Sequence, residues 1–288
     1  MATLRDIRRK ISSVKSTQQI TKAMKMVAAA KLRRAQENIL KTRPYAYRLN
    51  QVLGHVAGLV DRSIHPLLEE REAKRIGIVA VTADRGLCGA FNQNILRKAT
   101  EELEAQTKDV KDVFVIAIGR HARDYFRIRP YPVIYESYDF FSHLEFANAV
   151  RISEEIIRLF TQHELDHIHL VYNEFKSAIQ QNLTVEQLLP IQPVKPDIGR
   201  RKLEYLYEPS PDQILDALLP KQIDIQLWRV LLESNAAEQG ARMTAMEMAT
   251  DNASEMIDKL TLYYNRVRQA TITKEITEIV GGAEALNK

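Results

Sequence analysis

The chain has 288 residues and a formal net charge of +4, with 45% hydrophobic and 27% charged residues. This composition is that of a globular protein, so we exclude a chain that is disordered throughout. No run of about 18 apolar residues occurs, which excludes a membrane-spanning helix. The single cysteine, Cys88, excludes an internal disulfide and fits a reducing compartment.

The basic residues are concentrated at the N-terminus. Residues 1–48 hold thirteen Lys/Arg and only two acidic residues, whereas the rest of the chain is net acidic. Such a segment is expected to face nucleic acid, lipid headgroups or an acidic protein surface. No aromatic residue precedes Tyr45 to stack on bases, so we favour an acidic protein partner over nucleic acid. A plain solvated face stays an alternative.

Residues 1–43 contain neither glycine nor proline and predict one long helix. Residues at alternating spacings of three and four form a coiled-coil seam, apolar except at three consecutive polar positions. The seam consists of Ile7, Ile11, Val14, Gln18, Thr21, Lys25, Ala28, Leu32, Ala35 and Ile39.

The middle of the chain alternates between strand and helix patterns. We predict strands at 76–82, 113–118, 132–135 and 167–175, and helices at 90–106, 119–126 and 142–163. The last of these helices would open with a capping box formed by Ser142 and Glu145. A further strand or hairpin at the sheet edge is expected within 183–208. Continuous apolar strands alternating with helices predict a parallel sheet that is covered on both faces.

The C-terminal segment predicts a second long helix. Ser210 and Pro211 give a start signal, and Gly281-Gly282 gives an expected end. Its seam has the same spacing as the first and consists of Leu232, Ala236, Gln239, Met243, Met246, Thr250, Ala253, Ile257, Leu260, Tyr264, Val267, Thr271 and Lys274.

A helix of this length needs a partner, so we expect the two terminal helices to pair antiparallel. The alternative is two separate helices packed on a globular core. The expected fold is α/β, with a long antiparallel coiled coil and a central Rossmann-like domain. The expected domains are an N-terminal helix at 1–60, a central α/β domain at 75–208 and a C-terminal helix at 210–285.

Residues that could perform chemistry are few. The turn from Thr82 to Asn92 carries two glycines between a strand and a helix but lacks a complete phosphate-binding fingerprint, so we favour a structural role. Cys88 within it could be a nucleophile but is more typical of a small residue in a tight turn. His163, His167 and His169 could bind a metal, although a solvated helix end followed by a strand edge explains them better. We therefore expect no catalytic residue, no cofactor and no metal.

Several segments closely resemble the gamma subunit of F-type ATP synthases. They are residues 11–31, 84–92, 238–253 and 264–279, so the resemblance extends over the whole chain. Plant-chloroplast members carry an inserted redox cysteine pair, whereas this chain has only Cys88, so the sequence is similar to bacterial members.

The resemblance implies a non-catalytic rotor that couples proton-driven rotation of a c ring to catalysis in a ring of three alpha and three beta subunits. It implies contacts with the beta subunit at Met24, Lys25, Arg268 and Gln269. It also implies contacts with the c ring and the epsilon subunit at Tyr205, Tyr207 and Glu208, where burial beneath the sheet is the alternative. Membrane association would be indirect, through the c ring, at the cytoplasmic face of the bacterial membrane.

If the C-terminal helix extends past the first residue of the N-terminal helix, about its last fifteen residues are left without a partner. We expect this bare tip to rest in an apolar sleeve through Ile272, Ile276, Ile279 and Val280. Two further alternatives stay open: a basic coiled-coil adaptor that binds nucleic acid, and a diverged nucleotide-binding enzyme that uses the turn at Gly86 and Gly89.

Overall fold

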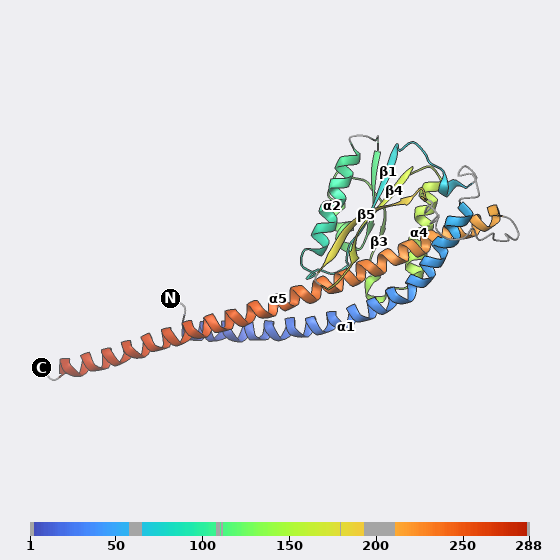
Figure 1. The fold of residues 1–288 in the computed structure, drawn as a ribbon. Coiled ribbons are helices and arrows are strands. Elements are labelled where there is room, and N and C mark those ends of the chain that lie inside the picture. Colours follow the sequence, from blue (N-terminus) through green and yellow to red (C-terminus); the bar gives the residue numbers. More distant parts are fainter. Residues whose placement is uncertain are drawn as a thin grey trace. The chain divides into compact units, whose positions relative to one another are not determined.

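The computed structural model describes residues 3–57, 65–107, 110, 112–178, 180–192 and 211–286 (Figure 1). The chain divides into a smaller compact unit, Met1–Ala28 with Met243–Lys288, and a larger one, Ala29–Arg242. The long helices α1 (Leu4–Ala57) and α5 (Pro211–Leu286) contribute to both units. No helix in the described part of the chain carries an apolar stretch that could cross a bilayer.

The larger unit is built on a five-stranded sheet with the order β3-β2-β1-β4-β5. Its strands are β1 (Arg75–Val81), β2 (Asp112–Ile118), β3 (Val133–Ser137), β4 (His167–Phe175) and β5 (Gln181–Leu189). The first four run parallel to one another, and β5 runs antiparallel to β4. Only residues 176–180 connect β4 to β5, which is too short for a parallel crossover. The prediction of a mainly parallel, Rossmann-like sheet is therefore confirmed, with an antiparallel strand at its edge.

Helices cover both faces of this sheet. Val79 and Val81 of β1 pack in the same core cluster as α4 (Phe146–Thr161), α5 and the end of α1. Ile76, Ile78 and Ala80 of the same strand pack with α2 (Phe91–Gln106) and α3 (Arg120–Phe126). Alternate residues of one strand point to opposite faces, so the continuous apolar run in β1 serves two cores.

The start of α4 differs from the prediction. Ser142 lies in a short 3-10 helix, η3 (Phe141–His143), and the capping residue is Glu145, whose partner in the capping box is Asn148. The helix therefore begins at Phe146 rather than at Ser142. Glutamate is an uncommon N-cap residue, which is why the sequence pattern favoured the serine.

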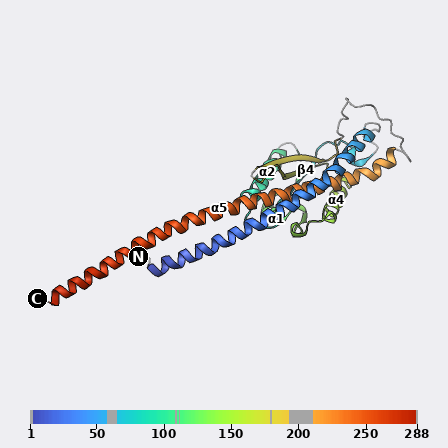
Figure 2. The same cartoon turned by 60° about the horizontal axis from the view of Figure 1, so that its bottom comes forward.

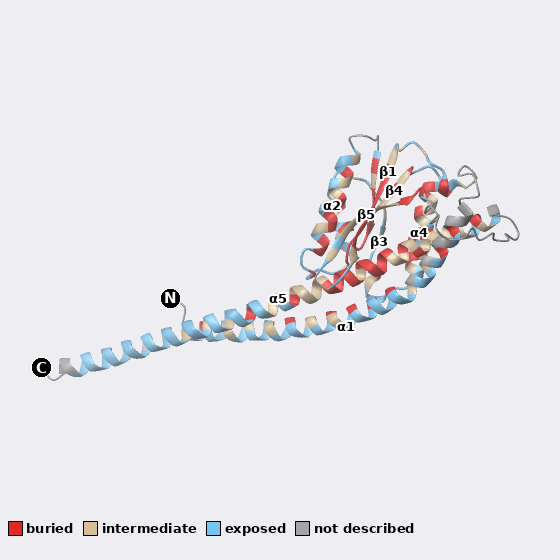
Figure 3. Cartoon of the chain, viewed as in Figure 1, coloured by how far each residue is buried: buried red, intermediate tan, exposed pale blue. Residues whose placement is uncertain are grey.

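The part of α5 in the larger unit is a core element. From Val230 to Gly240 every residue except Asn235 is buried (Figure 3). The predicted seam marks only Leu232, Ala236 and Gln239 there, so it underestimates this burial. A helix that is covered on all sides shows no amphipathic stripe. The core also extends beyond the predicted range 75–208, because it includes α5.

In the smaller unit, α1 and α5 form the predicted coiled coil. All seven predicted α1 positions here, Ile7 to Ala28, are buried or half-buried, and the residues between them, Met24 aside, are exposed. The α5 positions from Met243 to Thr271 are likewise shielded, whereas the last predicted position, Lys274, is exposed. The views in Figures 1 and 2 agree that these stretches lie side by side and that α5 continues past the N-terminus of α1.

The prediction that Gly281-Gly282 ends the helix is wrong, because α5 continues to Leu286. Neither glycine has the positive φ of a helix cap. Glycine permits a left-handed cap but does not impose one, and within a helix it costs about 1 kcal/mol relative to alanine.

Candidate functional site

A polar layer fixes the direction of the coiled coil in the smaller unit. The hydroxyl oxygens of Thr21 and Thr250 lie 2.8 Å apart, and Lys25 Nζ donates a hydrogen bond to Glu247 at 2.5 Å. As the residue number rises along α1 it falls along α5, so the pair is antiparallel as predicted. The alternative of two separate helices is therefore wrong for this unit.

This layer contains two of the residues that the resemblance implied as contacts with a beta subunit. Lys25 lies in the seam and its charge is paired with Glu247 of the same chain. Met24 is half-buried beside it, and Lys22 is exposed on the same stretch of helix. Lys25 therefore contributes to the pairing of the two helices whatever else it contacts.

The other two implied beta-contact residues lie where the seam runs out. The register of the polar layer places Leu4, the first residue of α1, opposite Val267. Arg268 and Gln269 follow directly and are exposed. No described side chain forms an ion pair with Arg268, so its guanidinium is available to an external carboxylate.

Beyond Thr271, α5 has no partner helix and every residue described to Ala283 is exposed. The exposed fractions of Ile272, Ile276, Ile279 and Val280 are 46%, 56%, 72% and 56%. The three isoleucines are four and three residues apart, so they share one helix face. The structure thus brings the predicted tip residues together as an uncovered apolar stripe.

In the larger unit, α5 occupies the position where a doubly wound sheet has its ligand crevice. This position lies outside the carboxyl ends of the strands at the topological switch point, here between β1 and β4. Glu233 of α5 accepts a hydrogen bond of 3.1 Å from the backbone N–H of Phe175 at the end of β4. A Cβ at Gly240 would lie 3.3 Å from the backbone of Ala178, so the glycine permits the close approach. A helix of the same chain fills this crevice.

A buried ion pair fastens α5 to the turn after β1. Arg242 donates hydrogen bonds to Glu238 at 2.5 Å and to the carbonyl oxygens of Arg85 and Gly86 at 3.2 and 3.0 Å. The exposed fractions of the Arg242 and Glu238 side chains are only 12% and 6%. Burial raises the pKa of Glu238, and the guanidinium of Arg242 opposes that shift.

The turn from Thr82 to Asn92 uses its polar groups internally. Asp84 accepts hydrogen bonds from the backbone N–H groups of Arg120 and Phe141, at 3.0 and 3.2 Å. The side chain of Asn92 accepts one from Ala83 N at 2.9 Å. These contacts support the structural interpretation of the turn over a phosphate-binding one.

Cys88 has the environment of a packing residue. It is 1% exposed, and the side-chain amide of Asn92 donates to its Sγ at 3.3 Å. Burial raises the pKa of the Cys88 thiol, although Arg242 opposes this. Reactive cysteines need a lowered pKa and access to solvent, so the nucleophile hypothesis loses its support.

The histidines do not form a ligand set. His163 follows α4 with a positive φ of 56°, and His167 Nε2 lies 3.1 Å from the carbonyl oxygen of Arg71. Within the described residues no group of three or more potential ligands could hold a metal ion. His163 is exposed just after the end of α4, and His167 is the first residue of β4. The residues expected to contact the c ring and the epsilon subunit, Tyr205, Tyr207 and Glu208, lie outside the described residues.

Comparison with known proteins decides the family. A family model described as ATP synthase matches residues 3–286. The ATP synthase gamma chain of Chloroherpeton thalassium is 51% identical, over 100% of this chain and 99% of its own length. That of Pelotomaculum thermopropionicum is 49% identical, over 99% of this chain and 100% of its own length. The chain belongs to the ATP synthase gamma-chain family. As a gamma chain, it is a central-stalk rotor subunit of an F-type ATP synthase.

Solved structures agree with this fold. A chain of the central stalk and c-ring structure of the Tetrahymena thermophila mitochondrial ATP synthase matches with a TM-score of 0.60 and 25% identity, covering 80% of this gamma chain and 99% of that chain. A chain of the Euglena gracilis mitochondrial enzyme matches with a TM-score of 0.70 and 21% identity, covering 98% and 94%. The second similarity supports the fold alone.

Two features of this gamma chain are not predicted by its sequence pattern. The first is the attachment of α5 at Glu238 and Arg242, which appeared only as letters of a family motif. Glutamate and arginine four residues apart are also typical of an exposed helix face, so spacing alone gives no sign of burial. The second is the Lys25–Glu247 pair. It depends on the register between two helices whose paired residues are 222 positions apart in the sequence.

Proposed function

We propose that this chain is the rotating shaft of its ATP synthase and performs no chemistry itself. The observation that carries the proposal is the antiparallel pair of unlike helices, with one helix continuing alone as an exposed tip. Such a pair has a different surface on each side. It can therefore present a different face to each of three surrounding beta subunits and favour a different conformation in each.

The tip would act as a bearing inside a ring of three alpha and three beta subunits. Ile272, Ile276, Ile279 and Val280 form an apolar surface without a partner in the described chain. Apolar contact is non-directional, so an apolar sleeve around this surface can hold the axis without favouring one angle of rotation.

Transfer of torque needs directional contacts, and the exposed polar groups below the tip supply candidates. We propose that Arg268 and Gln269 contact a beta subunit, and that Met24 and Lys25 lie near another of its segments. A single exposed ion pair contributes only about 0–1 kcal/mol. Coupling is therefore spread over many contacts, and Arg268→Ala alone leaves substantial ATP-driven rotation.

The larger unit would act as the foot that receives torque from the c ring, with the epsilon subunit beside it. Its attachment to α5 through Arg242, Glu238 and Glu233 supports this role, because force on the globular core passes directly into the helix. We propose Tyr205, Tyr207 and Glu208 as the contact segment. Association with the membrane is then indirect, at the cytoplasmic face in bacteria.

The test is reconstitution with the alpha and beta subunits, with a rotation probe attached to the larger unit. We expect co-purification with a nucleotide-binding hexamer, ATP-driven rotation of the probe, and no saturable nucleotide binding by the isolated chain. Every residue described from Ile272 to Ala283 is exposed, so a version ending at Thr271 should assemble and rotate with a less stable axis. Nucleotide hydrolysis by the isolated chain, or a hexamer that turns over equally well without it, would overturn the proposal.

A further inference from the structure

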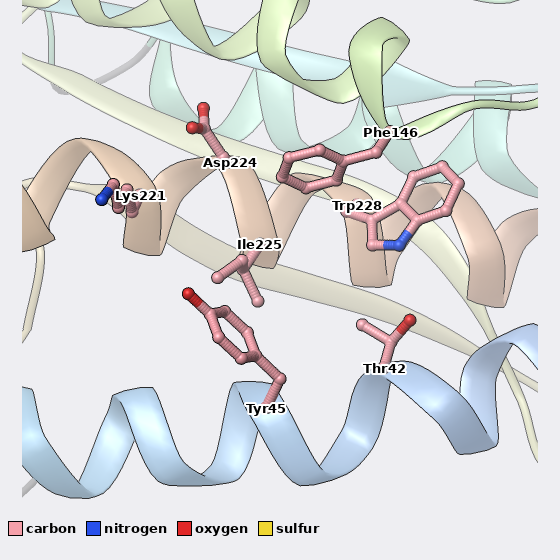
Figure 4. A pocket seen from close by; sticks show the side chains of 7 residues that line it. All are labelled: Thr42, Tyr45, Phe146, Lys221, Asp224, Ile225 and Trp228. Carbon is pink, nitrogen blue, oxygen red and sulfur yellow. The ribbon is translucent and has the colours of Figure 1, made fainter.

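A cavity of about 440 Å³ lies in the larger unit between α1, α4 and α5 (Figure 4). Small-molecule sites typically have volumes of roughly 300–1,000 Å³ and combine apolar walls with a few polar groups. The cavity lies outside the coiled-coil seam, the tip and the attachment at Arg242, so the shaft function does not account for it.

Three aromatic rings from three helices surround this cavity. Phe146 is the first residue of α4, and its ring meets that of Trp228 on α5 edge to face, with 5.9 Å between the centroids. Tyr45 of α1 rises toward α5 from the other side (Figure 4). Phe146 and Tyr45 are 45% and 57% exposed, so the packing of the protein leaves much of both rings uncovered.

The carboxylate of Asp224 lies beside these rings and forms no ion pair with a described side chain. Asp224 accepts a hydrogen bond from the Ser153 hydroxyl, and no described cationic side chain lies within ion-pair distance of it. Burial raises the pKa of Asp224, and the nearby carboxylate of Glu154 adds to this, whereas Ser153 and Lys221 oppose it. Asp224 is the only acidic residue and Lys221 the only basic residue among the described residues that line the cavity.

We propose that this cavity binds a small organic monocation with a flat apolar body. Its apolar part would lie against Phe146, Trp228 and Tyr45, and its charge beside Asp224. Aromatic faces attract cations through their quadrupole, most strongly when the site is partly shielded from water. The carboxylate adds charge complementarity and gains the cationic partner that it lacks in the free chain. The positive charge of Lys221 disfavours a ligand that carries more than one positive charge.

Trp228 makes the proposal directly testable, because it is the only tryptophan in the chain. The full chain is titrated with benzyltrimethylammonium while Trp228 fluorescence is recorded, and neutral benzyl alcohol and anionic benzenesulfonate serve as comparisons. We expect a saturable change with the cation and binding at least about tenfold weaker for the other two probes. The absence of saturation, or equal binding of all three probes, would overturn the proposal.

Variants separate the site from a general effect of charge. Asp224→Asn should weaken binding of the cation about tenfold and remove the preference over the neutral probe. Asp124→Asn, at an exposed position on α3, is the matched control and should leave binding unchanged. Lys221→Met should strengthen binding of the cation, a gain that misfolding does not produce. Unchanged binding in Asp224→Asn, or weaker binding in Lys221→Met, would contradict the site.

Discussion

The same helix, α5, has two different environments in the two units. In the larger unit, ten of the eleven residues from Val230 to Gly240 are buried. Of the buried polar side chains, Glu233 accepts a hydrogen bond from the sheet, and Glu238 is paired with Arg242 of the same helix. In the smaller unit, α5 is shielded only at every third or fourth residue from Thr250 to Thr271, and beyond Thr271 every residue described to Ala283 is exposed. One segment is a core element and the other is a surface element.

This difference shows how one chain can combine a fixed attachment with a changing contact surface. Buried polar groups are costly to disturb, because each loses a hydrogen-bond partner in a dry environment. Substitution of an exposed residue on the coiled coil of the smaller unit costs little stability, because water replaces the lost contact. Substitutions in the core of the larger unit should therefore alter stability, whereas those on the surface of the coiled coil should alter interactions with partners.

The largest expected effect is at a glycine in the larger unit. Gly119 has φ of 89°, and a Cβ there would lie 2.2 Å from the carbonyl oxygen of Thr82. Gly119→Ala should lower the free energy of unfolding by more than about 3 kcal/mol through strain and displacement of the strand end. Urea unfolding followed by Trp228 fluorescence measures this in the larger unit.

The matched control is Gly282→Ala in the exposed tip, where a Cβ would meet nothing within 4 Å. It should leave the Trp228 transition unchanged and raise helicity, because alanine favours a helix by about 1 kcal/mol over glycine. Equal losses of stability from the two substitutions would contradict the distinction between the core of the larger unit and the exposed helix of the smaller unit.

The next effect concerns the attachment of α5. Arg242→Met leaves Glu238 buried without its cation and removes two hydrogen bonds to the turn, so the free energy of unfolding should fall by about 3 kcal/mol. The double variant Glu238→Gln/Arg242→Met should recover part of this loss, because the uncompensated charge is gone. The exposed Arg268→Met is the control. A loss in Arg242→Met no larger than in this control would mean that the attachment is not structural.

Prediction from sequence succeeds where the pattern is periodic and local. The strands of the sheet follow from continuous apolar runs, and the seam positions from Ile7 to Thr271 follow from spacings of three and four residues. The capping residue Glu145 and the end of α5 were not predicted correctly, because each depends on a local backbone conformation that several sequences allow. The attachment at Arg242 was missed, because its partners are carbonyl oxygens 156 and 157 residues away.

A smaller effect should follow from the polar layer of the coiled coil. Thr21→Val removes the hydroxyl contact with Thr250 and should cost about 1 kcal/mol. Thr21→Val/Thr250→Val should recover most of this loss, because two apolar groups then face each other in the seam. Thermal loss of helical circular dichroism in the full chain measures both. If the double variant loses as much as two independent single substitutions, the threonines do not interact.

The smallest effect should appear as a dependence on pH. Burial lowers the pKa of His169 from its ordinary value of 6.5, and the neighbouring His167 lowers it further, while Glu102 opposes both. The unfolded chain therefore binds a proton at His169 as the pH falls through about 6.5, before the folded chain does. The free energy of unfolding of the larger unit should decrease as the pH falls from 7 to 5, and His169→Asn should flatten that slope.

His65 gives an independent check, because burial lowers its pKa as well, although Asp216 opposes the shift. The two histidines lie on different elements, so His65→Asn should flatten the slope separately and the double variant should combine both changes. Urea unfolding of all four proteins at pH 7, 6 and 5, followed by Trp228 fluorescence, measures the slopes. Identical slopes in the four proteins would mean that the fold keeps neither imidazole neutral. The contrast between the buried core of the larger unit and the exposed coiled coil of the smaller unit would then not extend to titratable groups.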